Sequence, residues 1–73
     1  MKYIIELTVI DEGNDWNFPL NTVVYWNENR PFVRDALDAT MFKSYDMIQQ
    51  MLEKIIDDGN FMPVVKTVIA QVV

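Results

Sequence analysis

The residues of this chain that could do chemistry are almost all carboxylates. It contains eleven acidic residues but no cysteine and no histidine, so thiolate chemistry is excluded and the commonest general base is missing. Asp35 and Asp38 are close enough in sequence to form a carboxylate pair, but 73 residues can hardly enclose a water-excluding pocket around them. The sequence has no Ser/His or Cys/His pair and no glycine-rich phosphate loop. We therefore expect a protein that is not an enzyme and takes no cofactor.

Oxygen ligands gather in one segment, Asp11-Glu12-Gly13-Asn14-Asp15, and such a segment brings a calcium loop to mind. It lacks the alternating acidic order of calcium loops, and no bidentate glutamate follows at the twelfth position. We interpret this segment as a solvated turn and expect no metal.

Three large apolar residues, Trp16, Phe18 and Leu20, alternate with polar residues and proline in the loop that follows. One interpretation is that the loop folds back and plugs an open end of the fold. The other is a protein-binding lip with aromatic anchors, because tryptophan and tyrosine dominate interface hot spots. A base-stacking platform fits poorly with the acidic surroundings.

Four acidic residues fall on one predicted helix: Asp46, Glu53, Asp57 and Asp58. They are typical of a solvated face that keeps an apolar small protein in solution. The alternative is nucleic-acid mimicry, in which carboxylates imitate a row of phosphates and occupy the basic groove of a partner.

The net charge of −5 argues against direct nucleic-acid binding, which needs clustered lysine and arginine. The six basic residues are scattered along the chain. The N-terminus has no signal-peptide cleavage site, and no apolar run approaches the roughly 20 residues that span a membrane. We expect a cytoplasmic protein that binds no membrane and no evident small-molecule substrate.

The elements that must position these residues begin with a predicted strand over Lys2–Ile10, whose odd-numbered side chains form an apolar face that should meet the core. Residues 11–21 read as a loop, and Thr22–Glu28 as a second strand. Between Phe32 and Phe42 the pattern is ambiguous. Residues 39–42 favour a short extended piece, and residues 33–37 fit either a strand or one helical turn.

A helix is predicted over residues 45–58. Ser44 is a good N-cap, Asp46 complements the helix dipole, and Gly59 is the expected left-handed terminator. An apolar stripe with helical spacing runs along it: Tyr45, Ile48, Met51, Leu52, Ile55 and Ile56. The helix is roughly four turns long, enough to cover three or four strands of a small sheet.

After Pro63, residues 64–73 predict a last strand that is apolar on both faces, as central strands and strands beside interfaces are. We expect one α+β domain, a two-layer sandwich of order β-β-(β)-α-β. Its three- or four-stranded antiparallel sheet has one helix, residues 45–58, across one face. The last strand and the mixed second face of Lys2–Ile10 lead us to expect a protein partner, with a homodimer as one form of it.

The segment Ala39-Thr40-Met41-Phe42-Lys43-Ser44-Tyr45-Asp46-Met47 resembles a pattern in small phage and prophage accessory proteins. There a short strand with alanine and phenylalanine leads through a Ser/Thr cap into a helix with an acidic first turn. Lys2-Tyr3 and Tyr25-Trp26 resemble the first two strands of such proteins, whereas Met47 and Ile48 stand where their helix usually has alanine. The resemblance implies a small α+β protein from a mobile element, located in the host cytosol. Some small acidic phage proteins inhibit host defence nucleases, CRISPR effectors included, and that is the class of the alternative function. No functional residue carries over.

Overall fold

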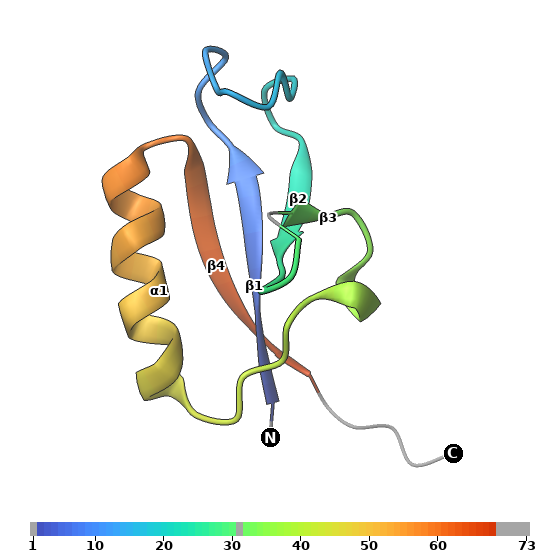
Figure 1. Ribbon diagram of the computed structural model, residues 1–73, viewed down its shortest axis with the longest axis vertical. Helices are drawn as coiled ribbons and strands as arrows, with labels where there is room; N and C mark the ends of the chain where they lie inside the picture. The colour runs from blue at the N-terminus through green and yellow to red at the C-terminus, as the bar shows by residue number, and fades with distance from the viewer. Residues whose placement is uncertain (1, 31, 69–73) are drawn as a thin grey trace.

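The computed structural model describes residues 2–30 and 32–68 as a four-stranded antiparallel sheet with one helix packed against it (Figure 1). Three strands come first: β1 (Lys2–Val9), β2 (Val23–Trp26) and the short β3 (Phe32–Val33). A 3-10 turn, η1 (Ala36–Asp38), leads to the helix α1 (Tyr45–Asp58) and then to β4 (Phe61–Val68). The sheet order is β3-β2-β1-β4, with every neighbouring pair antiparallel. The predicted α+β class and element order are confirmed, with the optional third strand present.

The core lies on the face of the sheet that carries the odd-numbered residues of β1, which we call the inner face. Ile5, Leu7 and Val9 are fully buried there, as the alternation in the sequence predicts. The opposite, outer face carries Ile4, Glu6 and Thr8, of which only Ile4 is buried. The outer face is therefore half covered, with an apolar residue beside polar ones.

The helix begins and ends where the sequence predicts, and its caps explain only part of this. Gly59 takes a left-handed conformation at φ 71°, and its N–H donates to the carbonyl of Ile56. Ser44 occupies the N-cap position with extended backbone, but its side chain makes no capping hydrogen bond. Burial of Ile48 and Ile55 against the sheet is therefore the larger stabilising contribution.

The helix packs on β4, at one side of the sheet, and does not lie across three or four strands. Beside it, aromatic side chains from the β1–β2 loop, β2 and β3 pack against the core, among them Phe18, Trp26 and Phe32. The prediction that the helix covers three or four strands rested on its length. Where a helix lies over a sheet depends instead on which side chains fill the rest of the space above the sheet.

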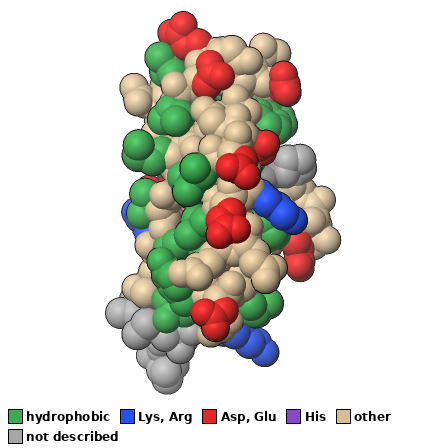
Figure 2. All heavy atoms as spheres, turned by 90° about the vertical axis from the view of Figure 1, so that its left-hand side faces the viewer, with side chains coloured by type: hydrophobic (Ala, Val, Ile, Leu, Met, Phe, Trp, Pro, Cys, Tyr) green, Lys and Arg blue, Asp and Glu red, His purple; other side chains and the backbone are tan. Residues whose placement is uncertain are grey.

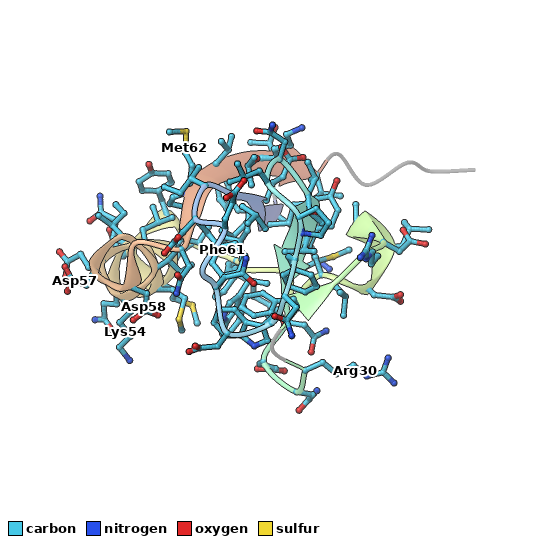
Figure 3. All side chains as sticks on the ribbon, turned by 90° about the horizontal axis from the view of Figure 1, so that it is seen from above. Arg30, Lys54, Asp57, Asp58, Phe61 and Met62 are labelled. Atoms are coloured by element: carbon cyan, nitrogen blue, oxygen red, sulfur yellow. The ribbon has the colours of Figure 1, made fainter. Side chains whose placement is uncertain are left out.

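The last strand differs from the prediction in its start and in its place. It begins at Phe61 and includes Pro63, instead of starting after the proline. It is an edge strand, paired only with β1 among the residues that the structure describes. Side chains alternate along it, and Figure 3 shows Phe61 pointing into the interior while Met62 points away from it. The predicted continuation over 69–73 lies outside the described residues.

Two predictions for residues 32–42 are resolved. The segment contains the short strand β3, and the helical turn proposed for residues 33–37 falls at η1. The predicted extended piece over residues 39–42 ends in an isolated bridge, in which Phe42 exchanges two backbone hydrogen bonds with Tyr3, at 2.9 and 2.8 Å. This bridge brings the chain from the β3 side of the molecule to the start of α1.

Candidate protein-binding groove

One buried polar side chain, Asn14, organises the loop between β1 and β2. Its amide nitrogen donates to the carbonyl oxygens of Asp11 at 2.8 Å and Phe18 at 2.9 Å. Its amide oxygen accepts from the backbone N–H groups of Trp16 at 3.1 Å and Phe18 at 2.9 Å. All four hydrogen bonds of the Asn14 side chain thus go to backbone groups of Asp11, Trp16 and Phe18. Asn14 thereby holds in place the backbone that positions the side chains of Trp16 and Phe18.

These loop aromatics meet others from β3 and β4 on the inner face. The ring of Trp16 lies edge-on to Phe32, with centroids 4.7 Å apart, and 5.4 Å from Phe61. Phe32 is also 4.7 Å from Phe61 and 6.0 Å from Phe18. Rings at such distances attract one another beyond the effect of their buried area. The four rings form a rigid aromatic layer beside the helix.

A groove runs along one side of α1, facing the aromatic layer at one end and Trp26, Glu28 and residues 40–42 at the other. It consists of two adjoining hollows of about 490 and 260 Å³, which share Trp26 and Met51 in their walls. The larger hollow is lined by aromatic and methionine side chains that include Trp26, Met41, Phe42, Met47 and Met51. The smaller one is bounded by Trp16, Phe32, Ile55 and Phe61. The smaller hollow is mainly apolar, the larger one combines its apolar residues with Glu28, Thr40, Asp46 and Gln50, and both tryptophans of the chain line the groove.

The charges that line the groove are mostly negative. Glu28 and Asp46 line the larger hollow, and Asp58 lines the smaller one together with Lys54. Figure 3 shows Arg30 projecting from the far side of the molecule, well away from Asp57 and Asp58. The groove thus combines an apolar floor with a rim of three carboxylates and one ammonium group.

The one ion pair among the described residues lies elsewhere, on the outer face. Lys66 Nζ is 2.9 Å from Glu6 Oε2, which also accepts a 3.3 Å hydrogen bond from the Tyr25 hydroxyl. The hydrogen bond and the charge of Glu6 raise the pKa of Lys66 above its ordinary value of 10.5. This cluster is a surface pair across three strands and does not touch the groove.

The predicted site residues fall into different places. Trp16, which is 38% exposed, and Phe18 belong to the aromatic layer, and Trp16 lines the groove. Leu20 is also exposed but lines neither hollow. Among the acids, helical spacing puts Asp46, Glu53 and Asp57 on one exposed ridge of α1, whereas Asp58 turns toward the groove. The structure therefore separates Leu20 and Asp58 from the sets in which the sequence placed them.

Four residues that line or support the groove were not predicted as site residues: Asn14, Trp26, Met47 and Met51. Only the two methionines carry a local signal, because their i, i+4 spacing places them on one side of α1. Met47 is 58% exposed, which is high for an apolar residue in a helix that packs on a sheet. Trp26 and Asn14 reach their roles through contacts distant in sequence, which periodicity does not show.

Two of the other carboxylates that suggested chemistry, those of Asp11 and Asp35, accept hydrogen bonds from nearby backbone. Asp35 accepts a 3.0 Å hydrogen bond from the N–H of Leu37 and caps η1. The Asp11 carboxylate accepts a 2.9 Å bond from the N–H of Gly13 in a tight turn. Within residues 2–30 and 32–68 there is no group of three or more acidic side chains that could hold a metal ion. No described helix is long and apolar enough to cross a membrane.

No protein-family model, curated protein or solved structure matches this chain.

Proposed function

We propose that this chain is a non-enzymatic accessory protein of the phage or prophage type that acts in the host cytosol by binding another protein. Its groove receives an apolar segment of that partner flanked by basic side chains. The observation that carries the proposal is the combination of an aromatic and methionine floor with a mainly acidic rim.

The floor of the groove suits a protein segment because its side chains are either rigid or adaptable. Trp16 and Trp26 offer large flat surfaces of the kind that dominate binding energy at interfaces. Met41, Met47 and Met51 are flexible and polarisable, and methionine surfaces adapt to partner side chains of different shapes. An apolar side chain inserted between them displaces water from both walls.

The negative charge of the rim favours a partner segment that is positively charged. Glu28, Asp46 and Asp58 outnumber Lys54, and the whole chain carries −5. A basic segment is attracted to this rim and approaches faster at low ionic strength, whereas an acidic one is repelled. The predicted occupant is therefore an amphipathic segment with lysine or arginine beside its apolar residues.

A calorimetric titration tests this with a peptide of alternating leucine and lysine blocks that forms an amphipathic helix, and with its leucine–glutamate counterpart. We expect only the basic peptide to bind. Met47→Lys should weaken its binding about tenfold or more, because it removes an apolar contact and adds a like charge to the groove. The matched control is Ile56→Lys, which makes the same change of charge on the other side of α1. Equal losses in both variants would contradict the proposal.

The second candidate is an acidic inhibitor of a host defence nuclease or DNA-binding protein, and the exposed ridge of α1 favours it. Asp46, Glu53 and Asp57 stand about 10 and 6 Å apart along the helix axis, and none of them forms an ion pair with a described residue. Figure 2 shows acidic side chains in a row down the side of the molecule that carries α1. A row of carboxylates of this kind resembles a row of phosphates.

Charge reversal distinguishes the two functions. Mimicry predicts that Glu53→Lys abolishes salt-sensitive binding to a basic nuclease while Trp16→Ala leaves it intact. Groove binding predicts the opposite: binding lost with Trp16→Ala and nearly kept with Glu53→Lys, because Glu53 lines neither hollow.

A further inference from the structure

The edge of β4 that pairs with no strand of residues 2–30 and 32–68, which we call its free edge, and the side of α1 beside it form a second surface, opposite the groove. Helical spacing places Tyr45, Gln49, Leu52 and Ile56 on that side of the helix, which we call the β4 flank. Ile56 is 61% exposed and Tyr45 is 48% exposed. No member of this set is charged. In Figure 2 hydrophobic side chains gather in a band along one side of the row of acids.

A hollow of about 350 Å³ lies where this flank meets the start of β4. It is lined by Ile10, Ile56, Gly59, Phe61, Met62 and Pro63, none of which is charged. Met62, 57% exposed, and Val64, 43% exposed, continue the apolar surface along the outer face of β4. Depletion of charge marks the cores of protein interfaces, and here it occurs on a chain of net charge −5.

The backbone of β4 offers hydrogen bonds along the same edge. The backbone N–H of Tyr3 donates to the carbonyl of Phe42, and that of Val9 donates to the carbonyl of Thr22, both on the side of β1 away from β4. The N–H of Ile10 donates instead to the carbonyl of Asn60. The backbone N–H and C=O groups of the even-numbered residues of β1 therefore point toward β4. The residues paired with them are Met62, Val64, Lys66 and Val68. The N–H and C=O groups of Val65 and Thr67 consequently point to the free edge. Pro63 does too, and its missing N–H costs no bond to β1.

We propose that this edge pairs with β4 of a second copy of the chain, joining two sheets into one of eight strands. The apolar pattern on both faces of β4 is typical of a central strand, and β4 becomes central only when a strand is added at its free side. Antiparallel pairing about a two-fold axis brings the two α1 helices together on the inner face, with their uncharged β4 flanks in contact. A standard interface needs on the order of 800 Å² from each copy, which is roughly 15% of the surface of 5326 Å².

The proline and the lysine of β4 select the register. When Val65 lies opposite Val65 of the second copy, Thr67 lies opposite Pro63 of that copy. The N–H of Thr67 then donates to the carbonyl of Pro63. Because proline has no N–H, only the carbonyl of Thr67 is left without a partner. Lys66 then lies opposite Val64 of the second copy. A slip of two residues between the strands, which moves the two-fold axis from Val65 to Lys66, places two Lys66 side chains opposite each other, which is unfavourable.

Sedimentation equilibrium on the full chain tests the inference. The wild type should show twice the mass of one chain at high concentration and dissociate on dilution. Ile56→Glu should weaken self-association on the order of 100-fold, because two like charges meet in the interface. Met47→Glu, an equally exposed apolar residue on the other side of the helix, should leave it unchanged. A monomeric wild type up to millimolar concentration, or Ile56→Glu that dimerises as well as Met47→Glu, would overturn the inference.

A second pair of variants tests strand pairing separately from the helix contact. Thr67→Pro removes an N–H that faces the free edge and should weaken the dimer about tenfold or more, whereas Thr67→Ala keeps that N–H and the dimer. Circular dichroism establishes that both variants are folded. A folded Thr67→Pro protein that dimerises like wild type would show that β4 edges do not pair. Because the proposed function uses the groove, the loss of either surface leaves the other measurable.

Discussion

The two sides of α1 are built from the same helix but present different chemistry. The groove side carries Met47, Met51 and charged residues and faces an aromatic layer fixed by a loop. The residues of the β4 flank carry no charge, and they lie beside an edge of β4 that pairs with no other strand in the described part of the chain. A helix that packs on an edge strand leaves surface exposed along both of its own sides. A helix centred on a sheet has the sheet beneath it on both sides. The off-centre position of α1 thus gives a small domain two separate surfaces.

The largest effect should come from Asn14→Ala, which breaks the groove side alone. It removes four hydrogen bonds and takes these partners from partly buried backbone groups of Asp11, Trp16 and Phe18. We expect a loss of about 3 kcal/mol in the free energy of unfolding, measured by urea denaturation. Asn14→Asp should not restore the stability, because its second carboxylate oxygen faces the carbonyl oxygens of Asp11 and Phe18 in place of the donating amide. Equal stability of Asn14→Ala and wild type would show that the loop is not held as described.

Trp16→Ala should have the next largest effect. Trp16 packs on Phe32 and Phe61 but remains 38% exposed, so we expect a loss of about 2 kcal/mol in thermal or chemical unfolding. Leu20→Ala, a neighbour outside the groove, should cost less than about 0.5 kcal/mol. A greater cost for Leu20 than for Trp16 would contradict the aromatic layer.

Gly59→Ala tests the end of the helix, where both sides of α1 meet. Nothing lies within 4 Å of an added Cβ, so the cost arises from the left-handed backbone at φ 71° and not from a clash. We expect about 1 kcal/mol, with Gly59→Asn costing less because asparagine tolerates this conformation. A similar loss for both substitutions would indicate that backbone conformation is not the cause.

The smallest effect concerns Lys66 on the outer face. Its pKa is raised in the folded protein, so its contribution to stability is fully present below its unfolded value of 10.5 and is lost as pH rises through the higher folded value. The stability difference between wild type and Lys66→Met should therefore be constant from pH 7 to 9 and shrink at pH values above 10.5. A difference that grows over that range would reverse the predicted sign.

The parts of the fold that depend on neighbours in sequence were predictable. The helix over residues 45–58 follows from its apolar spacing and from Gly59, and the buried face of β1 follows from simple alternation. The predicted start of β4 was too late, because proline usually interrupts a strand and the strand was therefore placed after Pro63. In an edge strand it does no harm when its nitrogen faces away from the partner strand, and this depends on the register with β1.

The groove was only partly predictable. Trp16 and Phe18 stand out as apolar residues in a polar loop, but their partners Phe32 and Phe61 are distant in sequence and join them only through the sheet order. The role of Asn14 depends on a loop conformation that composition does not determine. The uncharged side of α1 was visible as part of one apolar stripe, but sequence could not show that Tyr45 and Ile56 stay exposed.

The most direct test of the central claim, that the two sides of α1 are separate binding surfaces, uses the two tryptophans, both of which line the groove. The basic leucine–lysine peptide is titrated into ¹⁵N-labelled protein, and the two indole N–H signals are followed by NMR. We expect both signals to shift in wild type and in Ile56→Glu, and neither to shift at the same peptide concentration in Met47→Lys. Dilution of wild type without peptide should move the amide signals of Val65 and Thr67 and leave the indoles in place. Peptide binding detected by calorimetry without any indole shift would contradict the account.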